Sequence, residues 1–204
     1  MNRLVILLLL SAPVFAATPA PARDRVATNW RAVISAADRD RLRDARQAWT
    51  DALAKARTLN APAIAAQGAL FDPDVALADA KPPPGDYRCR VFKLGAKGPA
   101  NLDYVAYPAF RCRIASDGAL TRLTKLDGSQ RPTGILFDDG RYRQVFLGTL
   151  ILGDEARALP YGRDASRDMA GTMERVGARR WRLVLPAPRF ESMLDVVELV
   201  PAGP

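Results

Sequence analysis

The fold of this chain is decided by two segments, Tyr87-Arg88-Cys89-Arg90-Val91 and Phe110-Arg111-Cys112-Arg113-Ile114. They contain both cysteines of the sequence, each in the same Arg-Cys-Arg setting. Apolar and charged residues alternate in both segments, as is typical of strands with one buried face. The pattern predicts two antiparallel strands joined by a disulfide between Cys89 and Cys112, since paired cysteines are the rule outside the reducing cytoplasm.

The other face of these two strands carries four arginines. If Cys89 lies opposite Cys112, Arg88 faces Arg113. In the same register, Arg90 faces Arg111. Like charges directly opposite each other destabilise a sheet unless an anion neutralises them. We therefore expect an anionic ligand or partner on this arginine face.

The first residues have the pattern of a secretory signal peptide, predicted to span residues 1–16. A short basic region is followed by the apolar run Leu4 to Leu10 and by a cleavage site at Val14-Phe15-Ala16. The apolar run is shorter than the roughly 20 residues that a transmembrane helix needs. The sequence therefore predicts a periplasmic or secreted protein without a membrane span, cleaved near Ala16, with a flexible leader over residues 17–28.

Composition narrows the class of function. The chain has 204 residues, a net charge of +8 and no histidine. Without histidine, Ser-His-Asp and Cys-His catalysis and most zinc or copper sites are excluded, and no phosphate-binding glycine loop is present in the sequence. We expect no catalytic residue, metal or cofactor. The basic balance matches an anionic envelope component better than nucleic acid, because the arginines do not form a known nucleic-acid-binding module.

The N-terminal part, residues 29–81, has a helical pattern. Apolar residues recur at helical spacing after the capping residue Ser35, which predicts a helix over residues 36–59 that Asn60 and Pro62 end. The run Pro82-Pro83-Pro84-Gly85 then marks the boundary with a second region, residues 82–204.

This second region is extended and punctuated by turns such as Asp117-Gly118 and Asp127-Gly128. Eight strands are predicted, over residues 86–94, 104–115, 120–126, 133–137, 143–152, 169–176, 180–185 and 194–200. Short sequential strands with tight turns favour an antiparallel meander that removes its edges by closing. The predicted fold class is α+β, with a helical segment packed outside a closed or curled eight-stranded barrel or across its mouth.

The longest connection runs from Gly153 to Asp168, and long loops often carry binding groups. Tyr161 and Arg163 lie in this loop and are candidates for ligand binding. The alternative interpretation is a solvated loop that is held by its own ion pairs. The candidate ligand-binding residues are therefore Arg88, Arg90, Arg111, Arg113, Tyr161 and Arg163.

Several motifs together resemble a known family. They are Gly85-Asp86-Tyr87-Arg88-Cys89-Arg90, Lys125-Leu126-Asp127-Gly128-Ser129-Gln130-Arg131-Pro132, Phe146-Leu147-Gly148-Thr149, Tyr161-Gly162 and Arg180-Trp181-Arg182-Leu183. This set resembles an uncharacterised family of exported bacterial proteins, domain of unknown function 4893, over nearly all of the mature chain. The resemblance implies no catalytic residues. More loosely, Gly85-x-Tyr87 and the late Arg-Trp pair resemble calycin barrels, a group that includes lipocalins and small periplasmic inhibitors.

The leading hypothesis is a non-enzymatic exported protein that binds an anionic or amphipathic ligand or envelope partner, in the barrel mouth or on the arginine face. One alternative is an envelope hydrolase with paired carboxylates, at least one of which needs a raised pKa. The candidate acids are Asp154, Glu155, Asp168, Glu174, Asp195 and Glu198. In strands, such acids are more often partners of arginines such as Arg175, Arg180 and Arg182.

Two further alternatives follow from the sequence. Lys125 and Ser129 are close enough to be considered a dyad, but a turn is a poor place to lower the pKa of a lysine by burial. An inhibitor or scaffold that acts through its surface alone is the other possibility.

Overall fold

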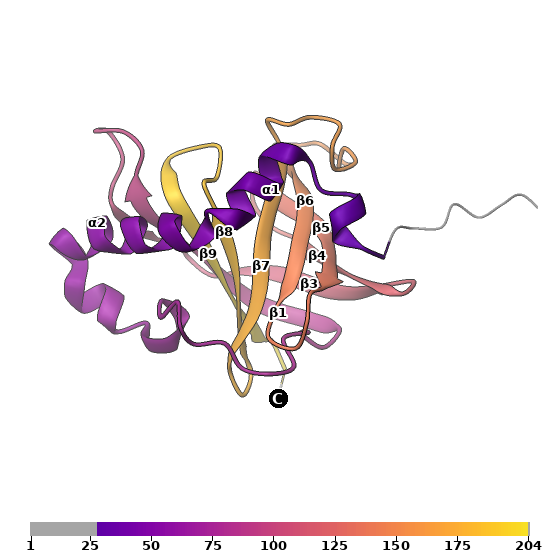
Figure 1. Cartoon of the computed structure of the whole chain (residues 1–204), viewed down its shortest axis with the longest axis horizontal. Coiled ribbons are helices and arrows are strands. Elements are labelled where there is room, and N and C mark those ends of the chain that lie inside the picture. Colours follow the sequence, from indigo (N-terminus) through magenta and orange to yellow (C-terminus); the bar gives the residue numbers. More distant parts are fainter. Residues whose placement is uncertain (1–27, 204) are drawn as a thin grey trace, which may run out of the picture.

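The structure is a computed structural model that describes residues 28–203. The predicted signal peptide, and the predicted leader apart from its last residue, lie outside the described residues. The described chain forms helices followed by a closed antiparallel β-barrel, which confirms the predicted fold class (Figure 1). Within this described part, none of the helices combines the length and the apolar character needed to cross a membrane.

The N-terminal segment contains two α-helices flanked by short 3-10 turns. They are η1 (Trp30–Ala32), α1 (Ala36–Arg43), α2 (Ala45–Ala65) and η2 (Gly68–Leu70). Ser35 caps α1, since its hydroxyl accepts a hydrogen bond from the backbone N–H of Asp38 at 3.1 Å. The single predicted helix is interrupted at Asp44 and continues beyond its predicted end. Pro62 kinks α2, with Asn60 at a non-helical φ of −129°, because proline removes one hydrogen bond and crowds the preceding turn without ending the helix.

The barrel strands follow one another in sequence order. They are β1 (Gly85–Ala96), β2 (Tyr104–Ala106), β3 (Phe110–Asp117), β4 (Leu120–Lys125), β5 (Gln130–Asp138), β6 (Gln144–Leu152), β7 (Asp168–Gly177), β8 (Arg180–Pro186) and β9 (Ser192–Pro201). β1 pairs with both β3 and β9, which closes eight strands into a barrel, and β2 is a short extra strand on β1. The predicted strand 104–115 is divided at residues 107–109, where Pro108 has no N–H to donate to the ladder.

The disulfide joins Cys89 and Cys112 as predicted, but the predicted register of the two strands was wrong by two residues. Cys112 lies opposite Tyr87, and Cys89 lies opposite Phe110. A shift of two residues keeps every side chain on its predicted face. It also places Arg113 opposite Asp86, so neither expected arginine pair forms, and one like-charge pair, Arg88 opposite Arg111, takes their place.

Removing this disulfide should destabilise the protein. Replacing Cys89 and Cys112 together with alanine is expected to lower the free energy of unfolding by about 3 kcal/mol, because the bridge spans 23 residues and restricts the unfolded chain. Urea unfolding of the wild type and the double variant measures the difference. An unchanged midpoint would show that strand pairing alone defines the stability of this region.

The barrel interior is packed at one end, which we call the closed end. Its apolar side chains include Tyr87, both cysteines, Phe146 and Trp181. Outside the barrel, α2 covers β1, β8 and β9, and α1 lies against β7 (Figure 1). The helices thus pack on the outer surface of the barrel, which is one of the two arrangements predicted, and not across its mouth.

Two glycines make room for the ring of Phe146 inside the barrel. Gly134 lies opposite Gly148 on neighbouring strands. A Cβ atom on Gly134 would lie 2.7 Å from the Phe146 ring, and one on Gly148 would lie 2.5 Å from it. Side chains at either position would therefore collide with the ring, which is fully buried. Phe146 fills the barrel at this level, and the hollow part lies beyond it.

Arg182 joins the N-terminal segment to the barrel. Its side chain is fully buried and pairs with Glu174 at 2.7 Å. The guanidinium also lies 4.4 Å from the ring centre of Trp49 in α2. It donates hydrogen bonds to four backbone carbonyls, those of Ala69, Leu70, Asp72 and Val75. One side chain from β8 therefore holds the helix and the segment that follows it on the barrel surface.

Candidate functional site

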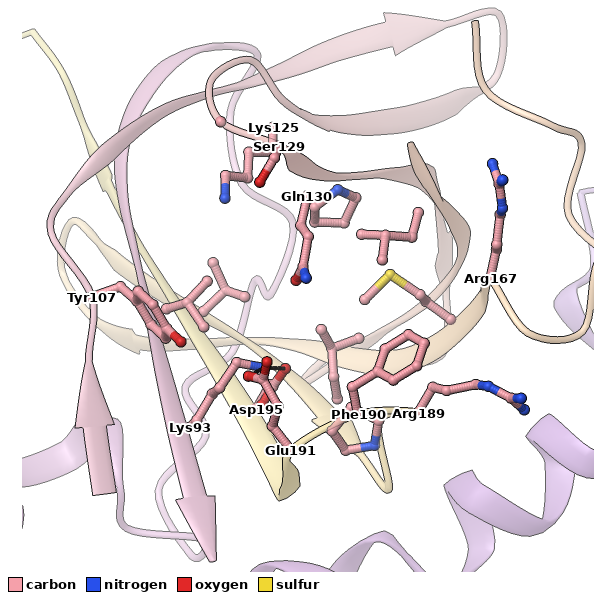
Figure 2. Close-up of a pocket in the computed structure, with 18 of the residues that line it drawn as sticks. Lys93, Tyr107, Lys125, Ser129, Gln130, Arg167, Arg189, Phe190, Glu191 and Asp195 are labelled. Carbon is pink, nitrogen blue, oxygen red and sulfur yellow. Dashed lines mark hydrogen bonds and ion pairs between the residues drawn. The ribbon is translucent and has the colours of Figure 1, made fainter. Parts of the chain in front are cut away.

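A cavity of about 490 Å³ opens at the end of the barrel opposite the closed end (Figure 2). We call this the open end. Its walls are formed by side chains near the ends of the barrel strands, and most are apolar. The apolar lining includes Val91, Phe110, Pro132, Leu150, Met169, Leu185 and Val197. A volume of this size suits a small molecule, since ligand pockets commonly measure about 300–1,000 Å³.

Two lysines line this apolar cavity. Lys93 follows Val91 on the inward face of β1, and Lys125 follows Leu123 on the inward face of β4. Strand periodicity therefore turns both side chains into the barrel. Figure 2 shows Lys125 across the cavity from Lys93 and Asp195.

Lys93 is neutralised by acids from β9 and the loop before it. Its ammonium lies 3.2 Å from Asp195 and 3.3 Å from Glu191. Despite burial, which acts to lower it, the pKa of Lys93 is raised by these two carboxylates. Burial raises the pKa of Asp195, which also accepts a hydrogen bond from Ser192 at 2.5 Å. The charge of Lys93 is therefore balanced by carboxylates of the protein itself.

Lys125 is placed differently. Its ammonium lies 4.3 Å from the ring centre of Phe110, a cation–π contact, and residues 28–203 provide no carboxylate in salt-bridge contact with it. The nearby acid Asp127 forms its ion pair with Arg111, at 2.9 Å. Burial lowers the pKa of Lys125; the charge of Asp127 partly opposes this effect, and the charge of Lys93 adds to it. The expectation that a turn here is a poor place to lower a lysine pKa by burial was therefore wrong, because Lys125 ends a strand and lines the cavity.

Aromatic and basic side chains surround the opening. Tyr107 and Phe190 lie on different sides of it, and Arg167 and Arg189 line its edge (Figure 2). Phe190 belongs to the β8–β9 loop, residues 187–191, in which Ala187 and Glu191 have φ values of 46° and 64°. Such left-handed backbone is unfavourable for residues other than glycine and is found at binding sites when the surrounding structure holds it.

The predicted arginine face lies on the outside of the barrel, away from the cavity. Three of its arginines pair with acids: Arg90 with Glu198, Arg111 with Asp127 and Arg113 with Asp86. The hydrogen bonds from Arg113 and Arg111 lower the pKa of Asp86 and of Asp127, respectively. Arg88 is exposed, and the described chain shows no ion pair for it. Most of the charge that suggested a ligand here is thus balanced by the protein, and a binding role of the four arginines stays a prediction.

Tyr161 also has a partner within the protein. Its hydroxyl donates to Asp38 at 2.5 Å and accepts from the backbone of Ser35 at 3.1 Å, and burial raises its pKa to about 12. Arg163 is exposed in the same loop. Arg167 pairs with Glu155 in this loop, as the alternative interpretation predicted. The structure does not bring Tyr161 and Arg163 together with the arginine face.

Most of the candidate catalytic acids are held by basic side chains. Glu174 pairs with Arg182, and Glu198 pairs with Arg180, as expected for acids in these strands. Burial raises the pKa of Asp168, which accepts a hydrogen bond from the backbone of Gly162 at 3.0 Å. Raised pKa values thus occur at Asp168 and Asp195, but Asp195 is paired with Lys93. Within residues 28–203, no three His, Cys, Asp or Glu side chains gather as metal ligands.

Sequence reasoning missed the two cavity lysines as site residues, although the sequence contained a signal for them. The apolar series Tyr87, Cys89 and Val91 continues in steps of two to Lys93. In the same way, Leu123 continues to Lys125. A lysine on the inward face of a barrel strand needs either a partner or a cavity.

The cavity and its lysines lie within a region that matches a known family. Residues 30–199 match the family model described as Domain of unknown function (DUF4893). The chain belongs to this family. No match was found among the curated proteins or the solved structures.

The DUF4893 match runs from η1 to β9 and so includes the helical segment together with the barrel. Lys93, Lys125 and the disulfide all lie within it. A disulfide is typical of proteins in an oxidising compartment outside the cytoplasm, which is consistent with the expected location of this DUF4893 protein.

Proposed function

We propose that this protein is a non-enzymatic, exported binding protein that takes up an amphipathic molecule with an anionic head group in the open end of its barrel. The observation that carries the proposal is Lys125, a half-buried cation that faces the cavity without a carboxylate in contact. An anion beside it would gain a charge-assisted hydrogen bond in a partly desolvated setting, where such bonds are strong.

The distribution of side chains in the cavity supports a particular orientation of the ligand. Apolar residues such as Val91 and Val197 come from within the strands, whereas Ser129, Arg167 and Arg189 lie in the loops around the opening. An apolar tail would therefore point into the barrel and the head group toward the opening. Each methylene buried in this way is worth about 0.8 kcal/mol, or about four-fold in affinity.

Dodecanoate is a suitable probe, because it combines a carboxylate with an apolar tail. Wild-type protein is expected to bind it in isothermal titration calorimetry, and more tightly than octanoate. Replacing Lys125 with methionine should weaken dodecanoate binding by about ten-fold or more, since a hydrogen bond to a charged group contributes about 1.5–3 kcal/mol. Lys81→Met, which changes an exposed lysine before the barrel, should leave the affinity unchanged.

The pH dependence of dodecanoate binding should identify the lysine. Because burial lowers the pKa of Lys125, its ammonium loses the proton at a lower pH than an exposed lysine does. Dodecanoate affinity should fall as the pH rises through this lowered pKa, and Lys125→Met should not show that fall. Equal binding of dodecanoate and of the cation dodecyltrimethylammonium, or unchanged binding by Lys125→Met, would contradict the proposal.

A further inference from the structure

Exposed apolar side chains collect in the loops around the open end. Leu102 is 72% exposed, Phe190 51%, and Tyr107 and Leu159 42% each. They come from four separate connections, β1–β2, β2–β3, β6–β7 and β8–β9. At the other end of the barrel, the β5–β6 turn exposes Tyr142, and the N-terminal segment exposes Val33, Leu59 and Leu77 singly. An exposed apolar residue by itself is ordinary, but four of them around one opening form a surface suited to a partner.

Hydrogen bonds join the loops at this end in pairs. The β1–β2 loop is joined to the β8–β9 loop, because Lys97 and Asn101 both donate to the carbonyl of Glu191, at 2.8 and 3.3 Å. Arg131 joins the β4–β5 turn to the β6–β7 loop through the carbonyls of Gly128 and Gly153. Figure 1 shows the β6–β7 connection and the β8–β9 loop at the same end of the barrel. We call these four loops, together with the β2–β3 connection that carries Tyr107, the rim.

The charge of the rim is predominantly positive once its ion pairs are considered. Most of its acids are paired: Asp103 with Lys55, Asp127 with Arg111, Glu155 and Asp164 with Arg167, and Glu191 with Lys93. By contrast, Arg157, Arg163 and Arg189 have no carboxylate partner in the described part of the chain, and Asp154 is the only rim acid there without a cation. Unpaired arginines beside exposed apolar side chains match a surface that is itself anionic and partly apolar.

We propose that the rim docks on an anionic lipid bilayer. Aromatic side chains favour the head-group region of a membrane, and leucines add apolar area that the acyl chains cover. Each arginine near an anionic membrane surface strengthens binding by roughly five-fold. The cavity opens within this rim, so a docked barrel faces the bilayer with its opening.

Vesicle binding tests the proposal. Wild-type protein is expected to sediment with vesicles that contain phosphatidylglycerol, to bind pure phosphatidylcholine much more weakly, and to be released partly by salt. Replacing Leu102 and Leu159 together with serine should weaken binding by about ten-fold or more, through lost apolar contact. Replacing Arg157 and Arg163 with glutamine should weaken it by about 25-fold, roughly five-fold for each arginine, and reduce the salt effect.

A matched control lies at the closed end. Replacing Arg141 and Tyr142 with glutamine and serine removes one arginine and one exposed aromatic side chain far from the rim, and binding should be retained. Absence of wild-type binding to the phosphatidylglycerol vesicles would overturn the proposal. An equal loss in the control variant would overturn it too, because net charge and not the rim would then explain the binding.

These variants test membrane docking and ligand binding in the cavity independently of each other. Leu102 and Leu159 do not line the cavity, so their variant should bind dodecanoate as the wild type does. Lys125→Met should lose dodecanoate while it still sediments with vesicles.

Discussion

Replacing Arg182 with methionine is expected to lower the free energy of unfolding by about 3–5 kcal/mol, because the change leaves a charge without its partner in the protein interior. Glu174 would lose the cation that lies 2.7 Å away, and four backbone carbonyls would each lose the hydrogen bond from this guanidinium. Chemical denaturation followed by circular dichroism measures the loss. Arg88→Met, which changes an exposed arginine of β1, is the matched control and should have little effect.

A second substitution separates the charge from the hydrogen bonds. Changing Glu174 to leucine together with Arg182→Met should restore part of the stability, since no buried charge is then left alone. Arg182→Lys keeps the charge but not the planar set of donors, so its stability should lie between those of wild type and Arg182→Met. If Arg182→Met unfolds within 1 kcal/mol of the wild type, roughly the worth of one ordinary hydrogen bond, this network does not hold the helices on the barrel.

Replacing Phe146 with alanine should destabilise the barrel to a similar extent, by about 3–5 kcal/mol, because it removes a fully buried ring and leaves a cavity. Gly134 and Gly148 have no side chains that could fill the space. Thermal unfolding compares this variant with Phe190→Ala, which removes an exposed ring and should change the stability little.

The same change should also alter ligand preference. Removing the ring extends the hollow part of the barrel toward the closed end, so longer tails such as hexadecanoate should gain affinity relative to dodecanoate. Phe146→Leu provides a milder version if the alanine variant does not fold. An unchanged ratio of the two affinities in a folded variant would show that tails do not reach this level of the barrel.

The sequence predicted an antiparallel meander and the approximate bounds of its strands, because alternation and Asp-Gly turns are local signals. It could not predict the register of β1 and β3, since two registers that differ by two residues bury the same faces. The observed register places Asp86 beside Arg113, whereas the predicted pairing considered arginines alone. The kink of α2 was also missed, because Pro62 was interpreted as the end of the helix. The helix continues to Ala65, and Ile64 packs in the core beneath it.

The candidate site was harder to predict from the sequence. Four arginines in a symmetric setting suggested a binding face, but three of them find acids on the same sheet or in the next turn. Such pairing depends on which strands are neighbours, and β9 lies far from β1 in the sequence. Whether a barrel is hollow depends on how its interior side chains pack, which the sequence pattern does not reveal. Lys125 gained its significance only when the strand that carries it was placed around a hollow.

The pairing of β1 with β9 has a consequence for how the protein is made. The first and last strands of the barrel are also neighbours, from Tyr87 beside Pro201 to Ala96 beside Ser192. A chain emerging from the ribosome therefore cannot complete its barrel until its last strand has emerged. Contacts between such distant residues form slowly, because much of the chain must be ordered before they do. The disulfide, in contrast, links β1 to its neighbour β3, so a crosslink that spans few residues is available while the C-terminal strand is still being delivered.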